Sequence, residues 1–222
     1  TLAQKRITIN KFKIDNKLIT EYLGEPKYLP NVKIKNEVGV VNGLAYTIYG
    51  GDTLKIEVNY YKGKGNLILT GQLGEVMKES AMIAISYIKS NANYFKVDYN
   101  IFENNDIHIH VPEGAIKKDG PSAGISLTTA IISSLKNVKI PSDIAFTGEM
   151  TLRGNVLPIG GLKEKSIGAH RNKIKKIFIP YDNISELTKI PDYIKKDITY
   201  IPVKNYKEIY KYLEDDINGI QK

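Results

Sequence analysis

The 222-residue sequence contains no cysteine and no tryptophan. Without cysteine there is no disulfide framework, no zinc site with thiolate ligands and no thiol nucleophile. Lys, Asn and Gly interrupt the longest apolar stretches, so none reaches the roughly 20 residues that a membrane-spanning helix needs. The sequence begins at Thr1 without a charged and then apolar leader. We therefore expect no signal peptide and no membrane partner, and we expect the chain to be a piece of a longer protein.

Phosphate-binding signals are also scarce. No stretch matches G-x-x-x-x-G-K-[ST], so we expect this chain to bind no nucleotide in the P-loop manner. The net charge is +8, but it is spread along both ends of the sequence and consists mostly of lysine. A solvated lysine-rich surface explains this charge better than a dedicated phosphate-binding stripe does. A nucleic-acid-binding module stays open as an alternative.

The composition, with 42% hydrophobic and 25% charged residues, is typical of a globular domain. Asn42-Gly43 and Gly50-Gly51 are interpreted as turns between early strands. Strands come first and then alternate with helices, which favours an α+β or mixed α/β class. Short apolar runs predict strands over residues 38–41, 45–49, 54–61, 66–70, 106–112, 144–148, 176–180 and 198–202. Helical spacing predicts helices over 74–92, 122–136, 162–172, 183–189 and 205–213, and in part over 3–23 before Gly24.

Ser122 is the first candidate for a catalytic residue. It lies in Gly-Pro-Ser-Ala-Gly, which matches the G-x-S-x-G pattern of a nucleophile elbow. It also precedes an apolar helix, whose unpaired N–H groups and positive dipole end could stabilise an oxyanion. A serine in this position also serves as a plain helix cap, so both interpretations stay open.

A nucleophilic serine needs a base, and histidine is the usual one. Asp143 or Glu149 followed by His170 obeys the chain order of an elbow-type triad. The segment before Ser122 is polar and contains proline, however, and His170 falls in the middle of a predicted helix. Both features count against a Ser-His-acid triad.

His108 and His110 alternate along a predicted strand and therefore share one face. Two histidines at this spacing could begin a metal site, but no third ligand is evident in the sequence. We therefore expect no metal, and interpret both residues as histidines satisfied by neighbouring groups.

Lysine is the remaining candidate for a base, provided that burial lowers its pKa toward neutrality. Lys163 and Lys165 both follow the Gly-Gly pair that leads into the predicted helix over 162–172. A helical wheel anchored on the apolar side chains of that helix, Ile167 among them, places Lys163 nearer the centre of the buried arc. Helical register alone therefore favours Lys163.

The sequence closely resembles the proteolytic domain of the ATP-dependent Lon proteases, A-type subclass. Two long motifs carry the resemblance, PEGAIKKDGPSAG and TGEMTLRGNVLPIGGLKEK, and it extends over roughly residues 36–213. NEVGVVNGLAYTIYGGD, LTGQLGEVMKES and AHRNKIKKIFIP add to it. Two positions depart from the family pattern: Lys117 stands where the family often has proline, and Tyr46 where it has tryptophan.

The resemblance implies a Ser-Lys dyad of Ser122 and Lys165, and so overrules the wheel. It implies that Thr147, in the TGE motif, holds the lysine amine. It places Asp119 at the mouth of the site, and we expect the N–H groups near Gly120–Ala123 to stabilise the oxyanion.

The resemblance further implies the ribosomal-protein-S5-domain-2-like α+β fold for residues 31–214. Residues 1–30 would then be the end of the ATPase module's small helical domain, and 215–222 a tail. It implies a homohexameric ring that degrades unfolded, damaged and regulatory proteins. ATP and Mg would act in the full-length protein, with no cofactor in this chain and DNA binding as an accessory property. We expect a bacterial cytoplasmic location first and an organelle matrix second.

Two rival expectations remain. A degenerate, assembly-only relative would lack one member of the dyad, whereas this sequence has both. The loop over 113–120 is expected to rearrange without the ATPase domains and to leave the dyad inactive. A distance of about 3 Å between Ser122 Oγ and Lys165 Nζ would count against that expectation.

Overall fold

The computed structural model describes residues 14–24, 36–47, 50–112 and 119–220. Contacts divide the chain into two units, residues 1–32 and 33–222. In the first unit, helix α1 spans Asn16–Leu23 and begins at Asp15, whose carboxylate accepts a hydrogen bond from Leu18 N. Gly24 ends α1 with a φ of 80°, which confirms the predicted helix stop. The assignment of residues 1–30 to an ATPase module stays a prediction.

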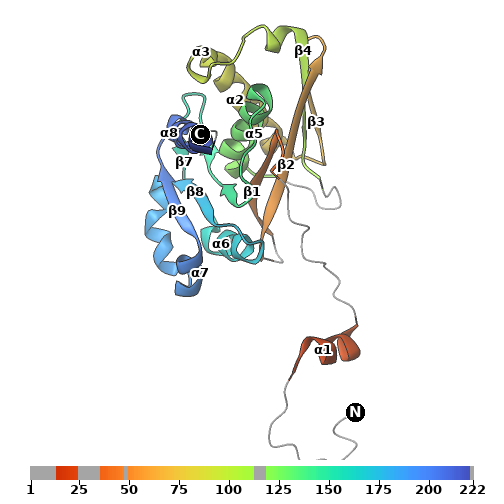
Figure 1. The fold of residues 1–222 in the computed structure, drawn as a ribbon, viewed down its shortest axis with the longest axis vertical. Helices are drawn as coiled ribbons and strands as arrows, with labels where there is room; N and C mark the ends of the chain where they lie inside the picture. The colour runs from red at the N-terminus through yellow and green to blue at the C-terminus, as the bar shows by residue number, and fades with distance from the viewer. Residues whose placement is uncertain (1–13, 25–35, 48–49, 113–118, 221–222) are drawn as a thin grey trace, which may run out of the picture. The chain divides into compact units, whose positions relative to one another are not determined.

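The second unit is built on a seven-stranded sheet with the strand order β3-β4-β2-β1-β5-β8-β9 (Figure 1). The pairs β1–β2 and β2–β4 are antiparallel, and the other four pairs are parallel. A short antiparallel hairpin of two further strands stands apart from this sheet. The strands are β1 Val40–Thr47, β2 Gly50–Lys62, β3 Leu67–Thr70, β4 Asn105–His110, β5 Ile144–Phe146, β6 Glu149–Met150, β7 Val156–Leu157, β8 Lys176–Pro180 and β9 Thr199–Val203.

Helices join and cover these strands, so the chain has a mixed α and β architecture. The predicted helices over 74–92, 122–136 and 162–172 are confirmed, whereas the last helix continues beyond the predicted end at Leu213 to Ile220. The helices are α2 Glu75–Ser90, α3 Ala92–Phe95, α4 Ile101–Asn104, α5 Gly124–Lys136, α6 Leu162–Arg171, α7 Asp192–Asp197 and α8 Tyr206–Ile220, with the 3-10 helices η2 Pro121–Ala123 and η3 Tyr181–Lys189.

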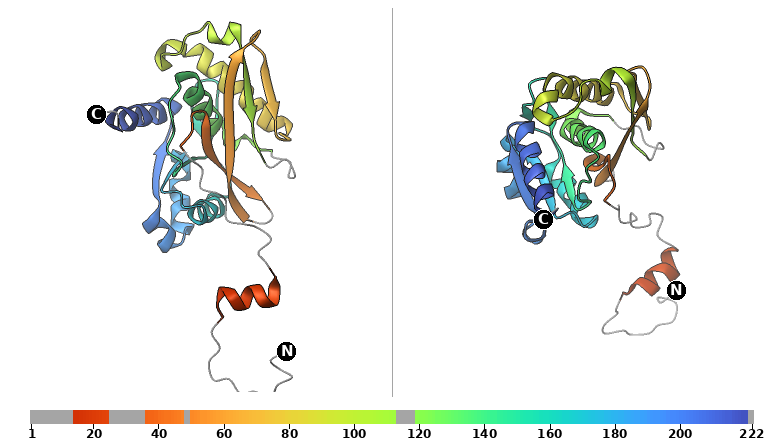
Figure 2. Two further views of the ribbon diagram at one scale, coloured as in Figure 1. Left: turned by 45° about the vertical axis from the view of Figure 1, so that its right-hand side comes forward. Right: turned by 45° about the horizontal axis from the view of Figure 1, so that its top comes forward.

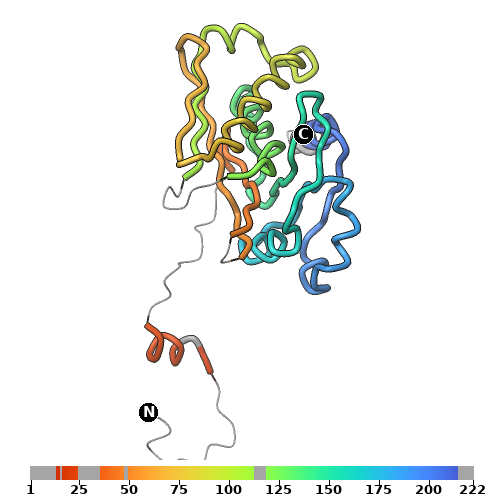
Figure 3. Tube along the Cα trace, turned by 180° about the vertical axis from the view of Figure 1, so that it is seen from behind, coloured from red at the N-terminus to blue at the C-terminus, as the bar shows by residue number. Residues whose placement is uncertain are grey.

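The sheet separates two hydrophobic clusters because successive side chains of a strand point to opposite faces. In β8, Phe178 belongs to the larger cluster, which includes residues of α2, α5 and α8. Its neighbours Ile177 and Ile179 belong to the smaller cluster, with residues of α6, η3 and α7. Helices α2 and α5 lie side by side in both views of Figure 2. Seen from behind, strands β8 and β9 form one side of the unit, and strands β2, β3 and β4 form the other side (Figure 3).

The predicted turn at Asn42-Gly43 is wrong, because both residues lie inside β1. Gly43 serves close packing here rather than a turn. A Cβ atom at this position would stand 3.2 Å from Ser126 Oγ of helix α5. The Asn42 side chain donates a hydrogen bond to Ser142 O at 2.9 Å. Glycine inside a strand therefore marks the close approach of another element.

The predicted turn at Gly50-Gly51 is also wrong, because both residues belong to β2. A Cβ atom at Gly51 would stand 1.8 Å from Glu164 O in helix α6. A Cβ atom at Gly168 would in turn stand 2.3 Å from Gly51 C. Two glycines thus allow the backbones of α6 and β2 to touch, and this crossing positions the helix that carries Lys165.

Candidate active site

Three segments meet where β5 ends. Ser122 lies in η2, directly before α5 on one side of the sheet. Thr147 follows the last residue of β5. Lys165 comes from the first half of α6, on the other side of the sheet. The carboxyl end of β5 is therefore the place where side chains from both layers can touch.

Lys165 joins these segments through two hydrogen bonds. Its Nζ atom donates to Ser122 Oγ at 3.0 Å and to Thr147 Oγ1 at 3.0 Å. The whole residue is only 3% exposed, and Thr147 is fully buried. Burial lowers the pKa of Lys165 from its usual 10.5 to about 8. A lysine with this pKa is partly neutral near physiological pH, as a general base must be.

Backbone hydrogen bonds fix the spacing between Ser122 and Thr147. Gly148 N donates to Ser122 O at 2.8 Å, and Ile125 N donates to Gly148 O at 3.2 Å. Thr147 N donates to Phe178 O of β8 at 3.0 Å. The turn that carries the serine is thus bound to the strand end that carries the threonine, so the two hydroxyl groups present a fixed pair of acceptors to Lys165.

Asp119 has a structural contact that the sequence did not reveal. Its Oδ1 atom accepts hydrogen bonds from Met77 N at 3.2 Å and from Gly120 N at 3.1 Å. The Asp119 carboxylate occupies the place of a Cβ atom at Gly74, the N-cap of α2. Asp119 therefore supplies the cap that Gly74 lacks. The signal is invisible in the sequence because the cap comes from a distant segment.

The backbone around Ser122 has the features of an oxyanion site in part. Gly120 has a φ of 143°, a conformation that favours glycine, and its N–H points to Asp119. Ala123 is buried. The first N–H groups of a helix have no intrahelical partner. The N–H groups of Ser122 and Ala123, at the start of η2 and α5, are therefore the better candidates.

The preference of the helical wheel for Lys163 is wrong. Lys163 is exposed, and Ile167, one of the apolar anchors of the wheel, is 38% exposed. The buried face of α6 instead contains the polar pair Lys165 and Ser166. The Ser166 hydroxyl donates to Leu162 O at 2.7 Å, which satisfies it inside the helix. The wheel failed because it assumed that the buried arc is the apolar one.

His170 does not join Ser122. Its Nε2 atom pairs with Asp197 Oδ2 of α7 at 2.8 Å, and its ring meets the Tyr193 ring edge-on. Ser122 Oγ is instead the acceptor of the lysine amine. The structure therefore does not bring together the histidine of the alternative triad and the serine, as the polar, proline-containing approach to Ser122 had already suggested.

His108 and His110 both contact Thr70 on the edge strand β3. Thr70 Oγ1 lies 2.9 Å from His108 Nε2 and 2.7 Å from His110 Nδ1. One nitrogen of each ring thus has the same hydroxyl as its hydrogen-bond partner, which agrees with histidines that contact neighbouring protein groups. Over the described parts of the chain, no three His, Cys, Asp or Glu side chains gather as a metal site would require. None of the helices in those parts is long and apolar enough to cross a membrane.

The expectation of an inactive dyad is not supported. An inactive dyad would hold Lys165 Nζ and Ser122 Oγ farther apart than about 3 Å, and the observed distance is 3.0 Å. This is hydrogen-bond distance for proton transfer. Most of the loop expected to rearrange, residues 113–118, lies outside the described residues.

Known proteins are similar to this chain over most of its length. Residues 13–214 match the family model described as the Lon protease (S16) C-terminal proteolytic domain. The chain is 54% identical over 208 residues to a Lon protease of Metamycoplasma arthritidis, covering 91% of this chain and 25% of the relative. It is 50% identical over 198 residues to one of Aster yellows witches'-broom phytoplasma, covering 89% and 25%. The chain thus spans about a quarter of the length of these curated relatives.

Proposed function

This chain belongs to the Lon protease family, a family of serine peptidases, as its C-terminal proteolytic domain, and on that premise we propose that Ser122 and Lys165 form its catalytic dyad. One observation carries the proposal: the buried Lys165 amine lies 3.0 Å from both Ser122 Oγ and Thr147 Oγ1. In this proposal Ser122 is the nucleophile, Lys165 the general base, and Thr147 the residue that orients the amine.

The proposed reaction begins with neutral Lys165. Its amine takes the proton of Ser122 Oγ as that oxygen attacks the carbonyl carbon of a peptide bond. The lysinium then gives the proton to the departing amine, and an acyl ester remains on Ser122. Lys165 next takes a proton from water, whose oxygen attacks the ester, and returns it to Ser122 Oγ. Thr147, an uncharged acceptor, holds the amine in line and favours its charged form less than a carboxylate in the same place would.

Negative charge on the tetrahedral intermediate needs donors near Ser122. We propose the backbone N–H groups of Ser122 and Ala123 for this role, at the start of the helix that η2 and α5 form. Gly120 supports the site by its open backbone, since nothing lies within 4 Å of a Cβ atom there. Asp119 supports it by bonding the segment before Ser122 to α2.

We further propose that the full-length protein cleaves unfolded, damaged and regulatory proteins with the help of ATP and Mg. Support comes from the sequence resemblance and from the relatives, which are Lon proteases by name. The chain itself has no P-loop motif. We therefore expect this chain alone to cleave only short peptides or proteins that are already unfolded.

The finer assignments of fold, assembly and location are proposals as well. We propose the S5-domain-2-like α+β fold for the mixed sheet, and a homohexamer in a bacterial cytoplasm. The family model begins at residue 13, inside the segment assigned to the ATPase module, so the domain boundaries stay a prediction. DNA binding as an accessory property is supported only by the net charge of +8. It predicts binding that weakens steeply as salt is raised.

The experiment that tests the dyad compares variants in the cleavage of unfolded casein and of a fluorogenic peptide. Ser122→Ala and Lys165→Ala are expected to lower kcat by at least about a thousandfold. Lys163→Ala is the matched control, because Lys163 lies on the same helix but is exposed. It is expected to keep full activity.

Two outcomes would contradict the proposal. Cleavage that persists in Ser122→Ala would remove the nucleophile from the mechanism. Cleavage that disappears in Lys163→Ala but persists in Lys165→Ala would assign the base to the exposed lysine. If the chain alone cleaves nothing, the same three variants are compared in the full-length protein.

A further inference from the structure

The position of Lys165 depends on how closely helix α6 approaches strand β2. The crossing of Gly51 and Gly168 leaves no side chain between the two backbones. A Cβ atom at Gly51 would also stand 2.8 Å from Lys165 N itself. Any movement of α6 away from β2 therefore moves the backbone of Lys165 by the same amount. The glycines allow this close contact, but they do not hold it.

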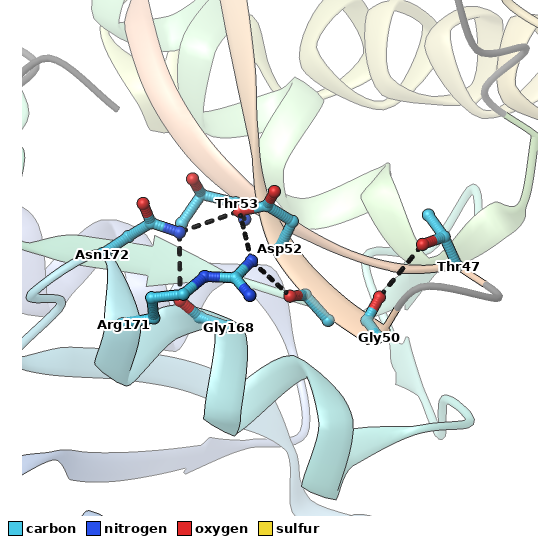
Figure 4. Close-up of polar contacts among 8 residues, drawn as sticks. Thr47, Gly50, Asp52, Thr53, Gly168, Arg171 and Asn172 are labelled. Carbon is cyan, nitrogen blue, oxygen red and sulfur yellow. Dashed lines mark hydrogen bonds and ion pairs between the residues drawn. The ribbon is translucent and has the colours of Figure 1, made fainter. Parts of the chain in front are cut away.

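Polar side chains at the end of α6 supply that hold, as Figure 4 shows. Arg171 Nη2 donates to Gly51 O at 3.0 Å and lies 3.4 Å from Asp52 Oδ1. Asn172 Nδ2 donates to the same Asp52 Oδ1 atom at 2.8 Å. We call Asp52, Arg171 and Asn172 the α6 clamp. Its contacts lie directly at the glycine crossing, because Asp52 follows Gly51 in β2.

Hydrogen bonds within the strand and within the helix orient the side chains of the α6 clamp. On the strand, Thr53 N donates to Asp52 Oδ1 at 2.8 Å and so fixes the carboxylate. On the helix, Asn172 is the C-cap of α6, and its side chain donates to Gly168 O at 3.0 Å. Asn172 thus bonds the glycine of the helix and the carboxylate of the strand at once. This arrangement fixes the rotation of α6 as well as its distance from β2.

We propose that Asp52, Arg171 and Asn172 are positioning residues that set the depth of Lys165 in the active site. This inference rests on the proposed role of Lys165 as the general base. None of the three residues touches Ser122 in the contacts described above. They act through the helix, by keeping the amine buried and within hydrogen-bond distance of the serine.

A contribution to stability alone would be small. The Arg171 and Asp52 side chains are 60% and 46% exposed, and surface ion pairs of this kind contribute little to the free energy of unfolding. The effect on Lys165 is expected to be larger, because burial is what lowers its pKa. Water that enters beside a loosened α6 would restore the charged amine. Displacing the base by about 1 Å would also slow the reaction up to a hundredfold.

The test measures the pKa of Lys165 in this chain by NMR, from the chemical shift of the lysine ε-methylene. Lys165→Met identifies the signal. Asp52→Ala and Asn172→Ala are expected to raise the pKa of Lys165 by at least about one pH unit. Where cleavage of a fluorogenic peptide is measurable, the same variants lower kcat about tenfold with little change in KM.

Two further variants separate positioning from general stability. Asp52→Asn keeps an oxygen acceptor for Thr53 N and Asn172, so it is expected to restore the pKa of Lys165 to about that of the unchanged chain. Asp197→Ala removes the polar pair that His170, on the same helix, makes with α7. This control is expected to leave the pKa of Lys165 unchanged, since it does not touch β2.

The outcomes distinguish this inference from the function on which it rests. A Lys165 pKa near 10.5 in the unchanged chain would refute the proposed general base. A depressed pKa that stays the same in Asp52→Ala and Asn172→Ala, while both variants remain folded by thermal melting, would refute the α6 clamp alone. An equal rise in Asp197→Ala would also refute it, because a general loosening of α6 would then suffice.

Discussion

Helices α5 and α6 both contribute to the candidate site, but they are buried in different ways. Every residue of α5 from Gly124 to Leu135 is buried. On α6 the buried residues include Lys165, Ser166 and Gly168, whereas Ile167 is exposed. Helix α5 is held mainly by apolar side chains, whereas α6 adds polar bonds at its end to the few apolar side chains, Leu162 and Ala169, that it buries in the smaller cluster. This comparison shows that a lysine can be buried where a helix packs on a strand through glycines, and that a row of large apolar side chains is not required.

The largest expected effect tests the backbone contact of α6. Gly51→Ala would place a Cβ atom 1.8 Å from Glu164 O. Backbone atoms must then move, so the free energy of unfolding is expected to fall by about 3 kcal/mol or more. Denaturant unfolding of the purified chain measures it. Gly160→Ala is the control, because nothing lies within 4 Å of a Cβ atom there, and an equal loss in both variants would contradict the account.

The next effect concerns the charge that α6 buries. Unfolding restores the pKa of Lys165 from about 8 to 10.5, so at pH 7 the folded chain carries the cost of a buried ammonium. Lys165→Met is expected to raise the free energy of unfolding at pH 7 by up to about 3 kcal/mol. The unfolded chain binds more protons between pH 8 and 10.5, so the gain shrinks across that window.

Denaturant unfolding at pH 7 and at pH 10.5 checks this prediction. Lys163→Met is the matched control and should change little at either pH, since Lys163 is exposed. If Lys165→Met raises the free energy of unfolding equally at both pH values, burial of the charged amine does not destabilise the folded chain. The benefit of Lys165→Met would then come from side-chain packing alone.

The smallest expected effect tests a polar group on the apolar helix. Ser126 of α5 is fully buried, and its hydroxyl donates to Phe146 O of β5 at 2.9 Å. Ser126→Ala is expected to lower the free energy of unfolding by about 1–2 kcal/mol. Ser90→Ala, which removes an exposed bond to Ser86 O, serves as the reference and should cost less. If both substitutions cost the same, burial of Ser126 contributes nothing.

The same contrast explains which parts of the molecule could be predicted from the sequence. Helix α5 follows from its apolar run, and β8 from Lys176–Pro180, because hydrophobic patterning reports local structure directly. Gly43 and Gly51 were misinterpreted as turns because close packing against a distant helix leaves the same residue type as a turn does. Patterning within one segment cannot tell these two uses of glycine apart.

The candidate site was predictable only in part. Ser122 had a local motif, but helical register pointed to Lys163, and only the family resemblance pointed to Lys165. The cap that Asp119 gives α2 and the α6 clamp join segments far apart in the chain, so no local pattern reveals them. These contacts determine the geometry of the candidate site, and they can be identified only once the fold is known.

The measurement that tests the central claim most directly is the rate at which a fluorophosphonate labels Ser122, followed from pH 6 to 10. The proposed dyad predicts a rate that rises with pH and levels off above an apparent pKa of about 8, the value that burial gives Lys165. It also predicts that Lys165→Ala nearly abolishes labelling, whereas Lys163→Ala does not. A rate that is unchanged in Lys165→Ala would show that this lysine does not activate Ser122, and would contradict the account.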